Sequence, residues 1–435
     1  MTTPLNPADT AQYSDVSDSG IARAQLLVKL TYPLIVICAF GLYWMCAVML
    51  ESNHAASNFG SDSVLYVGIA YGNVQDRLTR FHPATVGLAI VWMKLITPFS
   101  GALFKHHLLW GLFAAIGAAG VWAALSAFEK LVPRRYVLIC GLIYAVSFGV
   151  WFFASTAESK ILTATLATAY IAIYLRLRER WTVHGTLALM AVLGAACLNE
   201  IVSALLLIIP VLDIYARRRT SLADMKWVAP QIAVVALVYL AMSAGMADES
   251  AAVSTNPEGN SFSSMFWFYV GITSHSWTAL YGFMLNWLFF NIAAPTATAY
   301  ASTPEWSGYF GYFEPSFMNY FNTLVSTSLV GLTGLMAVTS LAPGWRSEGP
   351  AAVGIIWPLM AYSSIRALFF FIFNPPEVML FSSAATLPHL VLLPARFAAS
   401  KFPAKTSVLL AFAAPLFATN LRFMIGLEND SAIVR

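Results

Sequence analysis

Charge is what this sequence has least of. Asp, Glu, Lys and Arg make up only 10% of its 435 residues, whereas soluble globular chains carry about 25%. Hydrophobic residues make up 59%, and the mean hydropathy is +0.69. This balance excludes an ordinary soluble domain, and the small net charge of +3 gives no reason to expect nucleic-acid binding. The chain is therefore predicted to be a polytopic membrane protein.

Cysteine is scarce, and the N-terminal residues show no recognisable leader sequence. All four cysteines (Cys38, Cys46, Cys140 and Cys197) fall in apolar segments, where we interpret them as small hydrophobic residues and not as disulfide partners or metal ligands. The first 22 residues are polar, with no basic n-region and no cleavage-like site. They predict a disordered cytoplasmic tail over residues 1–22 and not a signal peptide. No internal repeat is visible, so the inverted-repeat architecture of many secondary transporters is not favoured.

Apolar stretches of roughly 20 residues recur along the chain, and alternating strands of about 10 residues do not, which predicts helical spans. The fold class expected is an all-α polytopic transmembrane helical bundle of about eleven spans. Arg23 and Lys29 lie at the start of the first span and place the N-terminus in the cytoplasm by the positive-inside rule. The predicted spans are Leu26–Leu50, Leu108–Phe128, Tyr136–Ala154, Ile161–Leu175, His184–Leu198, Ile201–Ile214, Trp227–Gly245, Asn319–Leu341, Ala351–Phe373, Val378–Pro394 and Thr406–Ile425.

The apolar stretch Ala84–Phe104 fits either a span or a helix lying in the membrane interface. Charge favours the interface, because a crossing would leave Lys130, Arg134 and Arg135 outside. With this choice the basic segments Arg176–Arg180, Arg217–Arg219 and RFAASKFPAK all fall inside. One alternation of spans thus explains every basic cluster.

The same reading divides the chain into four parts: the tail, a transmembrane module over residues 23–245, an external or membrane-skimming aromatic region over 246–318, and C-terminal helices over 319–435. The first module contains a large external loop, 51–105, with interfacial helices. The aromatic stretch Phe262–Asn291 fits an external membrane-skimming element and also an extra hairpin.

Polar motifs follow one another in the first half of the chain. The external loop carries SDSVLY, with Asp62 and Tyr66, and then RFHP, with Arg80 and His82. FEKLVPRR ends the next span, STAESK brings Glu158 and Lys160 to an external turn, and an LNE turn with Glu200 separates two short helices. This order, over Leu26–Arg219, resembles the GT-C superfamily of membrane glycosyltransferases. That superfamily includes protein O-mannosyltransferases, oligosaccharyltransferases and the transferases that place aminoarabinose on lipid A.

The resemblance implies transfer of a sugar from a polyprenyl-phosphate-linked donor to a glycan, lipid or protein acceptor on the extracytoplasmic face, in a membrane such as the bacterial inner membrane. Asp62 would be the general base, because the acceptor must lose a proton, and Glu158 would be the second catalytic carboxylate. Together they would hold a divalent cation, Mg²⁺ or Mn²⁺, if one is used. Substrate binding would fall to Tyr66, Arg80, His82, Lys160, Glu200 and Arg366.

Each candidate also has a simpler interpretation. Asp62 also fits a solvated loop acid or a helix N-cap, and Glu158 fits a surface ion pair with Lys160. Arg366 lies about 12 Å from the outer end of its span, where a cation either binds a phosphate or snorkels to the headgroups. Arg422 is a secondary candidate cation, and His106 and His107 fit an interfacial position better than a metal site.

Two other function classes stay open at the level of sequence. In a transporter or channel, the same buried charges would line a translocation path. In a non-catalytic envelope-assembly subunit, they would have no chemical role.

Overall fold

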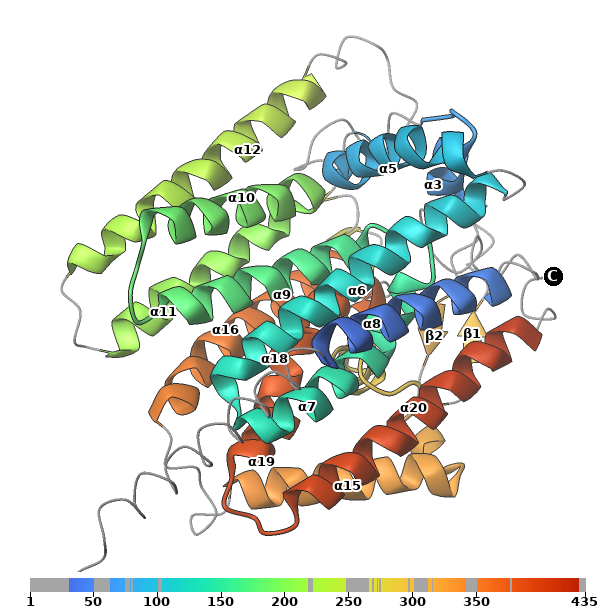
Figure 1. Ribbon diagram of the computed structural model, residues 1–435, viewed down its shortest axis with the longest axis vertical. Coiled ribbons are helices and arrows are strands. Elements are labelled where there is room, and N and C mark those ends of the chain that lie inside the picture. The colour runs from blue at the N-terminus through green and yellow to red at the C-terminus, as the bar shows by residue number, and fades with distance from the viewer. Residues whose placement is uncertain are drawn as a thin grey trace, which may run out of the picture.

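The structure is a computed structural model that describes residues 31–50, 63–74, 79, 81–100, 104–217, 222–247, 266–267, 270–271, 273, 275–295, 298–300, 312–314, 316–341, 350–375 and 378–429. It is a helical bundle (Figure 1). The all-α polytopic fold expected from the sequence is confirmed, with one two-stranded ribbon as an addition.

All the regular elements described in the first half of the chain are helices. Its elements are the first helix (Thr31–Leu50), α3 (Ser63–Ala70), α5 (Pro83–Ile96), η1 (Thr97–Phe99), α6 (Lys105–Leu131), α7 (Arg134–Val146), α8 (Phe148–Ala154), α9 (Lys160–Leu177), α10 (Val183–Asn199), η2 (Ile201–Leu207), α11 (Ile208–Arg217), η3 (Leu222–Trp227) and α12 (Ala229–Ala247).

The second half has shorter and more broken elements. They are α14 (Trp277–Leu285), the π-helix η4 (Asn286–Phe290), β1 (Thr298–Tyr300), β2 (Tyr312–Glu314), η5 (Phe317–Phe321), α15 (Leu324–Leu341), α16 (Pro350–Phe373), α17 (Val378–Ser382), η8 (Ser383–Ala385), α18 (Thr386–Leu390), the π-helix η9 (Val391–Ala395), α19 (Arg396–Ala399) and α20 (Lys405–Asn429). β1 and β2 pair antiparallel, with Ala299 opposite Phe313.

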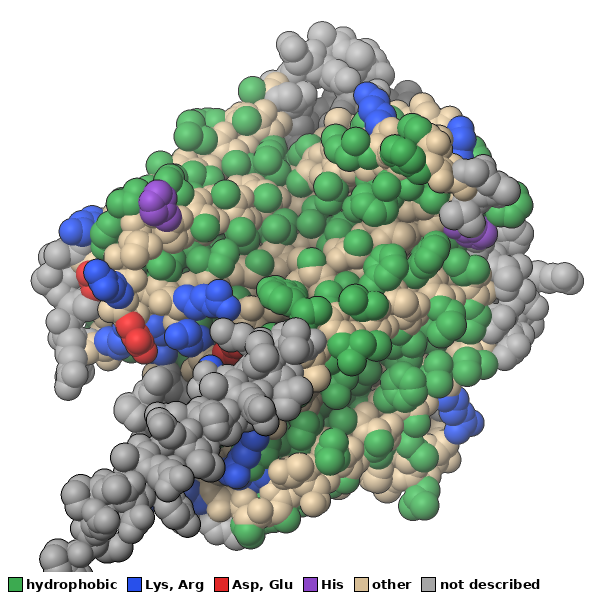
Figure 2. Space-filling view, in the orientation of Figure 1, with side chains coloured by type: hydrophobic (Ala, Val, Ile, Leu, Met, Phe, Trp, Pro, Cys, Tyr) green, Lys and Arg blue, Asp and Glu red, His purple; other side chains and the backbone are tan. Residues whose placement is uncertain are grey.

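Within the described residues, seven helices are long and apolar enough to cross a membrane, or eight if the bent pair α7–α8 is one span. Three further apolar helices are shorter: Pro83–Phe99, Val183–Asn199 and Leu324–Ser340. Figure 2 shows hydrophobic side chains over most of one face, with Lys and Arg gathered mainly towards its ends. An apolar belt of this kind is what a bilayer requires, and the chain is an integral membrane protein.

Helix α6 forms the centre of the bundle. It is rich in Ala and Leu, which favour helix, and its side chains from Leu108 to Leu131 are mostly buried. Two of its glycines let neighbours approach closely, because an added Cβ would lie 2.5 Å from the Ala154 Cβ at Gly117 and 2.7 Å from the Thr165 hydroxyl at Gly120. Small residues at such contacts are typical of packed membrane helices. They bring α8 and α9 against α6.

Three predicted spans differ in detail from what the apolar pattern predicts. The span from Tyr136 to Ala154 bends by 58° between α7 and α8. The stretch from Val378 onward is a succession of short α, 3₁₀ and π segments, and α15 begins at Leu324, after the 3₁₀ helix η5. The backbone groups freed at a break form hydrogen bonds with other parts of the chain. The apolar pattern of the span itself therefore does not reveal the break.

The ends of α9 and α11 and the starts of α7 and α20 carry basic residues, and they lie towards the lower left of Figure 1. Arg176 lies 3.7 Å from Glu129, Arg178 meets α11, and Lys405 lies over the Tyr136 ring. This is the arrangement that the positive-inside reading predicts, and the assignment of this end to the cytoplasm stays a prediction. Helices α3 and α5 lie towards the opposite end.

Candidate functional site

Of the eight predicted site residues, six lie in the described part of the chain. Asp62, the predicted base, and Arg80 lie outside the described residues. Their roles stay predictions.

Glu158 and Lys160 lie in the turn that joins α8 to α9. α8 ends at Ala154 and α9 begins at Lys160, and the Glu158 amide donates to the Thr156 carbonyl at 2.9 Å. The turn folds into the protein interior, since Glu158 is 0% and Lys160 5% exposed. An exposed ion pair is therefore the wrong interpretation of these two residues.

Asn199, at the end of α10, holds three elements together beside this turn. Its amide nitrogen donates to the Ser159 carbonyl at 3.0 Å and to the Thr163 hydroxyl at 2.8 Å. Its side-chain oxygen accepts from the Thr85 hydroxyl at 2.5 Å, and its carbonyl lies 2.7 Å from His82 Nδ1. The start of α5, the start of α9 and the end of α10 thus meet at one buried amide. The LNE motif predicted this turn, but it indicated no role for Asn199.

The next residue, Glu200, forms a buried ion pair with Arg366 of α16. Arg366 Nη2 lies 2.6 Å from Glu200 Oε1, and the two side chains are 0% and 8% exposed. Arg366 Nε donates to the Phe381 carbonyl at 3.3 Å. Within the described part of the chain, Arg366 Nη1 and Glu200 Oε2 make no hydrogen bond. Since buried polar atoms are normally paired, these two mark a place for a polar ligand or an ordered water.

Lys160 lies over Phe381, one of two phenyl rings that stack on each other. Its Nζ is 4.5 Å from the centre of the Phe381 ring, the Phe370 ring stacks on Phe381 at 3.8 Å, and the Arg366 guanidinium lies 4.9 Å from the Phe370 centroid. Cation–π contacts of this kind offset part of the cost of burying a cation. Phe381 comes from α17.

Neighbouring cations lower the pKa of the Glu200 carboxyl. Burial raises the pKa of the Glu200 carboxyl, but the charges of Arg366, Lys160 and His82 lower it by more, so the pKa lies below its ordinary value. Glu200, Arg366, Lys160 and His82 therefore form one electrostatic cluster.

The remaining candidates lie elsewhere. Tyr66 is buried in α3 with its ring edge-on to Phe113 of α6 at 5.7 Å. His106 and His107 lie among aromatic rings, with His106 Nδ1 2.6 Å from the Tyr71 hydroxyl. Arg422 is exposed on α20.

The described residues do not assemble a metal centre. No group of three or more His, Cys, Asp or Glu side chains suited to a metal ion occurs among them, and Glu200 is committed to Arg366. The predicted ligand pair is Asp62 and Glu158, of which only Glu158 is described. The divalent cation stays a prediction.

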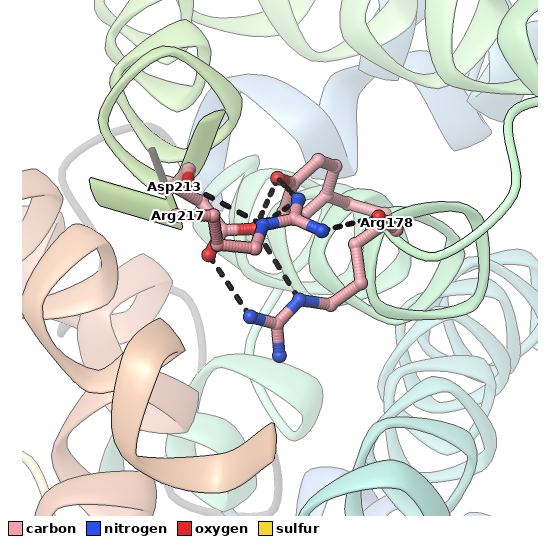
Figure 3. Close-up of polar contacts among 4 residues, drawn as sticks. Arg178, Asp213 and Arg217 are labelled. Carbon is pink, nitrogen blue, oxygen red and sulfur yellow. Dashed lines mark hydrogen bonds and ion pairs between the residues drawn. The ribbon is translucent and has the colours of Figure 1, made fainter. Parts of the chain in front are cut away.

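A second charged cluster, at the basic end of the bundle, was not predicted. Asp213 of α11 is fully buried, and its carboxylate lies 2.9 Å from Arg178 Nη2 and 2.6 Å from Arg217 Nη2 (Figure 3). The Tyr174 hydroxyl donates to the same carboxylate at 2.5 Å. An acid inside an apolar segment was the signal available in the sequence. The cluster joins the end of α9 to α11.

No protein-family model and no curated protein matches this chain. Two solved structures are similar in fold, both of an oligosaccharyltransferase from Archaeoglobus fulgidus. One is tethered through a disulfide to an acceptor peptide with the NVT sequon (14% identity, TM-score 0.47, 90% of this chain and 55% of that chain). The other is AglB in complex with an inhibitory peptide and a dolichol-phosphate (13% identity, TM-score 0.45, 89% and 56%).

The chain thus spans a little over half the length of these two proteins. Both are oligosaccharyltransferases, one of the kinds of enzyme in the GT-C superfamily that the sequence resembles.

Proposed function

We propose that this protein is an integral membrane glycosyltransferase that moves a sugar from a polyprenyl-phosphate-linked donor to a glycan, lipid or protein acceptor on the extracytoplasmic face. The proposal is supported by four buried charged residues, Glu158, Lys160, Glu200 and Arg366, of which Arg366 and Lys160 both contact Phe381 of α17. All four are candidate site residues that the sequence predicts.

The observation that carries the proposal is the environment of Lys160. This side chain is 5% exposed, yet no carboxylate lies within 4 Å of its Nζ among the residues that the structure describes. A buried cation without a close counter-ion is costly, and a bound anion would remove that cost. Arg366 adds an unbonded Nη1 nearby. The phosphate of a lipid-linked donor suits both groups, because guanidinium and ammonium bind phosphate oxygens.

The proposed chemistry is a single displacement at the sugar's anomeric carbon. Asp62 takes the proton of the acceptor hydroxyl or amine as the acceptor atom bonds to that carbon. The bond from the carbon to the phosphate oxygen breaks, and the phosphate leaves with the electron pair. Lys160 and Arg366 stabilise the charge that develops on it. Inversion at the carbon is what the GT-C resemblance implies.

The other residues have supporting roles in this proposal. Glu158 orients the acceptor next to Asp62, and Glu200 holds Arg366 in place. His82 lies 2.7 Å from the Asn199 carbonyl, and with Tyr66 and Arg80 it would bind the substrates, as the GT-C resemblance implies.

A transporter is the second candidate, and one observation favours it. Glu200 and Asp213 stand at the two ends of the segment η2–α11, and each forms a buried ion pair with another helix. Two such pairs could close a path alternately at either end. A transporter would move a solute across proteoliposomes, and the transferase would not.

The deciding experiment is mass spectrometry of envelope glycolipids and glycoproteins in a deletion strain. The strain receives wild type, Asp62→Asn, Lys160→Gln or the control Lys94→Gln, which removes an exposed cation from α5. We expect a sugar that is missing in the deletion strain and restored by wild type and by Lys94→Gln, but not by the other two variants. An unchanged sugar profile in the deletion strain would overturn the proposal.

A further inference from the structure

The break between α7 and α8, two helices that together are long and apolar enough to cross a membrane, is the feature that the proposed function does not explain. α7 ends at Val146, Ser147 is extended (φ −62°, ψ 135°), and α8 starts again at Phe148 after the 58° bend. The break exposes backbone groups that a continuous helix would pair. In the hydrocarbon region such groups need partners within the protein.

The partners come from the segment that follows η4 and from α20. The amides of Phe148 and Gly149 donate to the carbonyls of Ile292 and Asn291, at 2.9 and 2.8 Å. The Asn420 amide nitrogen donates to the carbonyls of Val146 and Ile292, at 2.7 and 2.9 Å.

The side-chain nitrogen and oxygen of Asn420 both form hydrogen bonds with the backbone. Besides its two donor contacts, its Oδ1 accepts from the Ala294 amide at 2.7 Å. Two donors and one acceptor in one plane are what an Asn side chain offers and Asp or Ala does not. Asn420 is fully buried, so loss of these bonds would leave buried backbone groups unpaired.

Asn291 continues the junction towards the candidate site. Its Nδ2 donates to the Ser382 carbonyl at 3.1 Å, and its Oδ1 accepts from the Thr386 hydroxyl at 3.2 Å. Ser382 follows Phe381, whose ring lies under Lys160 and whose carbonyl binds Arg366. On the other side, α8 leads within four residues to Glu158.

We infer that Asn291 and Asn420 are positioning residues, which set the α8–α9 turn with Glu158 and Lys160 at a fixed place relative to Phe381 and Arg366. Neither amide contacts these charged side chains. They act through the backbone of the break and through the segment Ser382–Thr386. That the positioned groups serve a phosphate-bearing donor rests on the proposed function.

The test uses the full chain in lipid nanodiscs with Asn420→Asp, Asn420→Ala and the neighbour Thr419→Val. Thr419 is the matched control, because its hydroxyl is buried on the same helix but has no hydrogen-bond partner among the described residues. Asn420→Ala gives the result if the buried charge of Asn420→Asp prevents folding. Hydrogen exchange by peptide is the first readout, and affinity for a polyprenyl phosphate is the second.

We expect amide exchange to accelerate about tenfold or more in peptides covering 147–160 and 286–295 of the Asn420 variants, with α6 and α12 unchanged. Affinity for the polyprenyl phosphate should fall about tenfold, and Thr419→Val should change neither readout. Equal acceleration throughout the bundle, no acceleration in 147–160, or a local acceleration with unchanged affinity would each overturn the inference.

If wild type binds no polyprenyl phosphate, the proposed function fails. Exchange in the 155–160 turn still decides whether Asn420 holds that turn. The two failures are therefore distinguishable.

Discussion

At the scale of single residues, Glu200 and Arg366 are two charges that are costly to bury and that hold each other in position. Each is expensive to bury, and each is tolerated because the other lies 2.6 Å away. Removing one partner of a buried pair leaves an uncompensated charge, which costs more than the pair is worth. The pair therefore fixes the position of the Arg366 guanidinium.

We predict that Arg366→Met destabilises the protein by about 3–5 kcal/mol, because Glu200 is then left buried and unpaired. Glu200→Gln combined with Arg366→Met should recover much of that loss. The control is Glu129→Gln, which breaks the half-exposed pair with Arg176 at 3.7 Å and should change stability by less than about 1 kcal/mol. Thermal unfolding in detergent measures all four proteins. Equal effects at the two pairs would contradict the prediction.

The same pair should give stability a defined pH dependence. The pKa of Glu200 is lower in the folded protein than its ordinary value of about 4.3, so the unfolded state binds more protons at acid pH. The stabilisation is complete above the ordinary value and is lost as the pH falls through the folded pKa. The difference in unfolding temperature between wild type and Glu200→Gln should stay constant from pH 7 to about pH 5 and shrink below about pH 4. A difference that shrinks already near pH 6 would show that another group is responsible.

Broken elements, rather than long straight helices, surround the site at the scale of secondary structure. The α7–α8 bend is bonded to Asn291, which follows the π-helix η4, and Asn291 is bonded to Ser382 at the end of α17, next to Phe381 of the charged site. Irregular backbone inside a membrane protein is tolerated where protein buries it or where it lines a cavity. Each break turns a polar group or a helix end towards neighbours from a different part of the chain.

Gly149 allows the closest of these approaches, and its replacement is predicted to be harmful. A Cβ at this position would lie 1.9 Å from Asn291 Oδ1, so Gly149→Ala should cost about 1–3 kcal/mol through overpacking. Gly87→Ala on α5 is the control, because no atom lies within 4 Å of the added Cβ. Alanine there should stabilise by about 0.5–1 kcal/mol through helix propensity. Thermal unfolding should therefore shift in opposite directions for the two variants, and a shift of the same sign would refute this account.

At the scale of the whole molecule, the distribution of charge predicts the orientation of the protein in the membrane. Basic residues gather at one end of the bundle, where Asp213, Arg178 and Arg217 tie α9 to α11 (Figure 3). The Glu200–Arg366 cluster lies at the other end of the η2–α11 segment. If the basic end is cytoplasmic, the candidate site opens to the extracytoplasmic side.

Cysteine labelling in intact cells tests this orientation. In a chain without its four native cysteines, we expect Glu179→Cys to react with an impermeant maleimide only after the membrane is opened. Asn73→Cys should react in intact cells, and both positions are exposed in the structure. Reaction of position 179 from outside would reverse the orientation and remove the proposed site from the donor's face.

The sequence by itself determined the class of the protein, the approximate place of its apolar helices and the residues worth examining. These follow from local properties, because a bilayer selects apolar length and charge sorts the loops without reference to any partner. The tertiary structure decided that Glu158 and Lys160 are buried, that Glu200 pairs with Arg366 across 166 positions, and that Asn291 and Asn420 close a broken span. Burial, ion pairing and the repair of a helix break depend on which distant segments come together, and the apolar pattern of one segment carries no record of its neighbours.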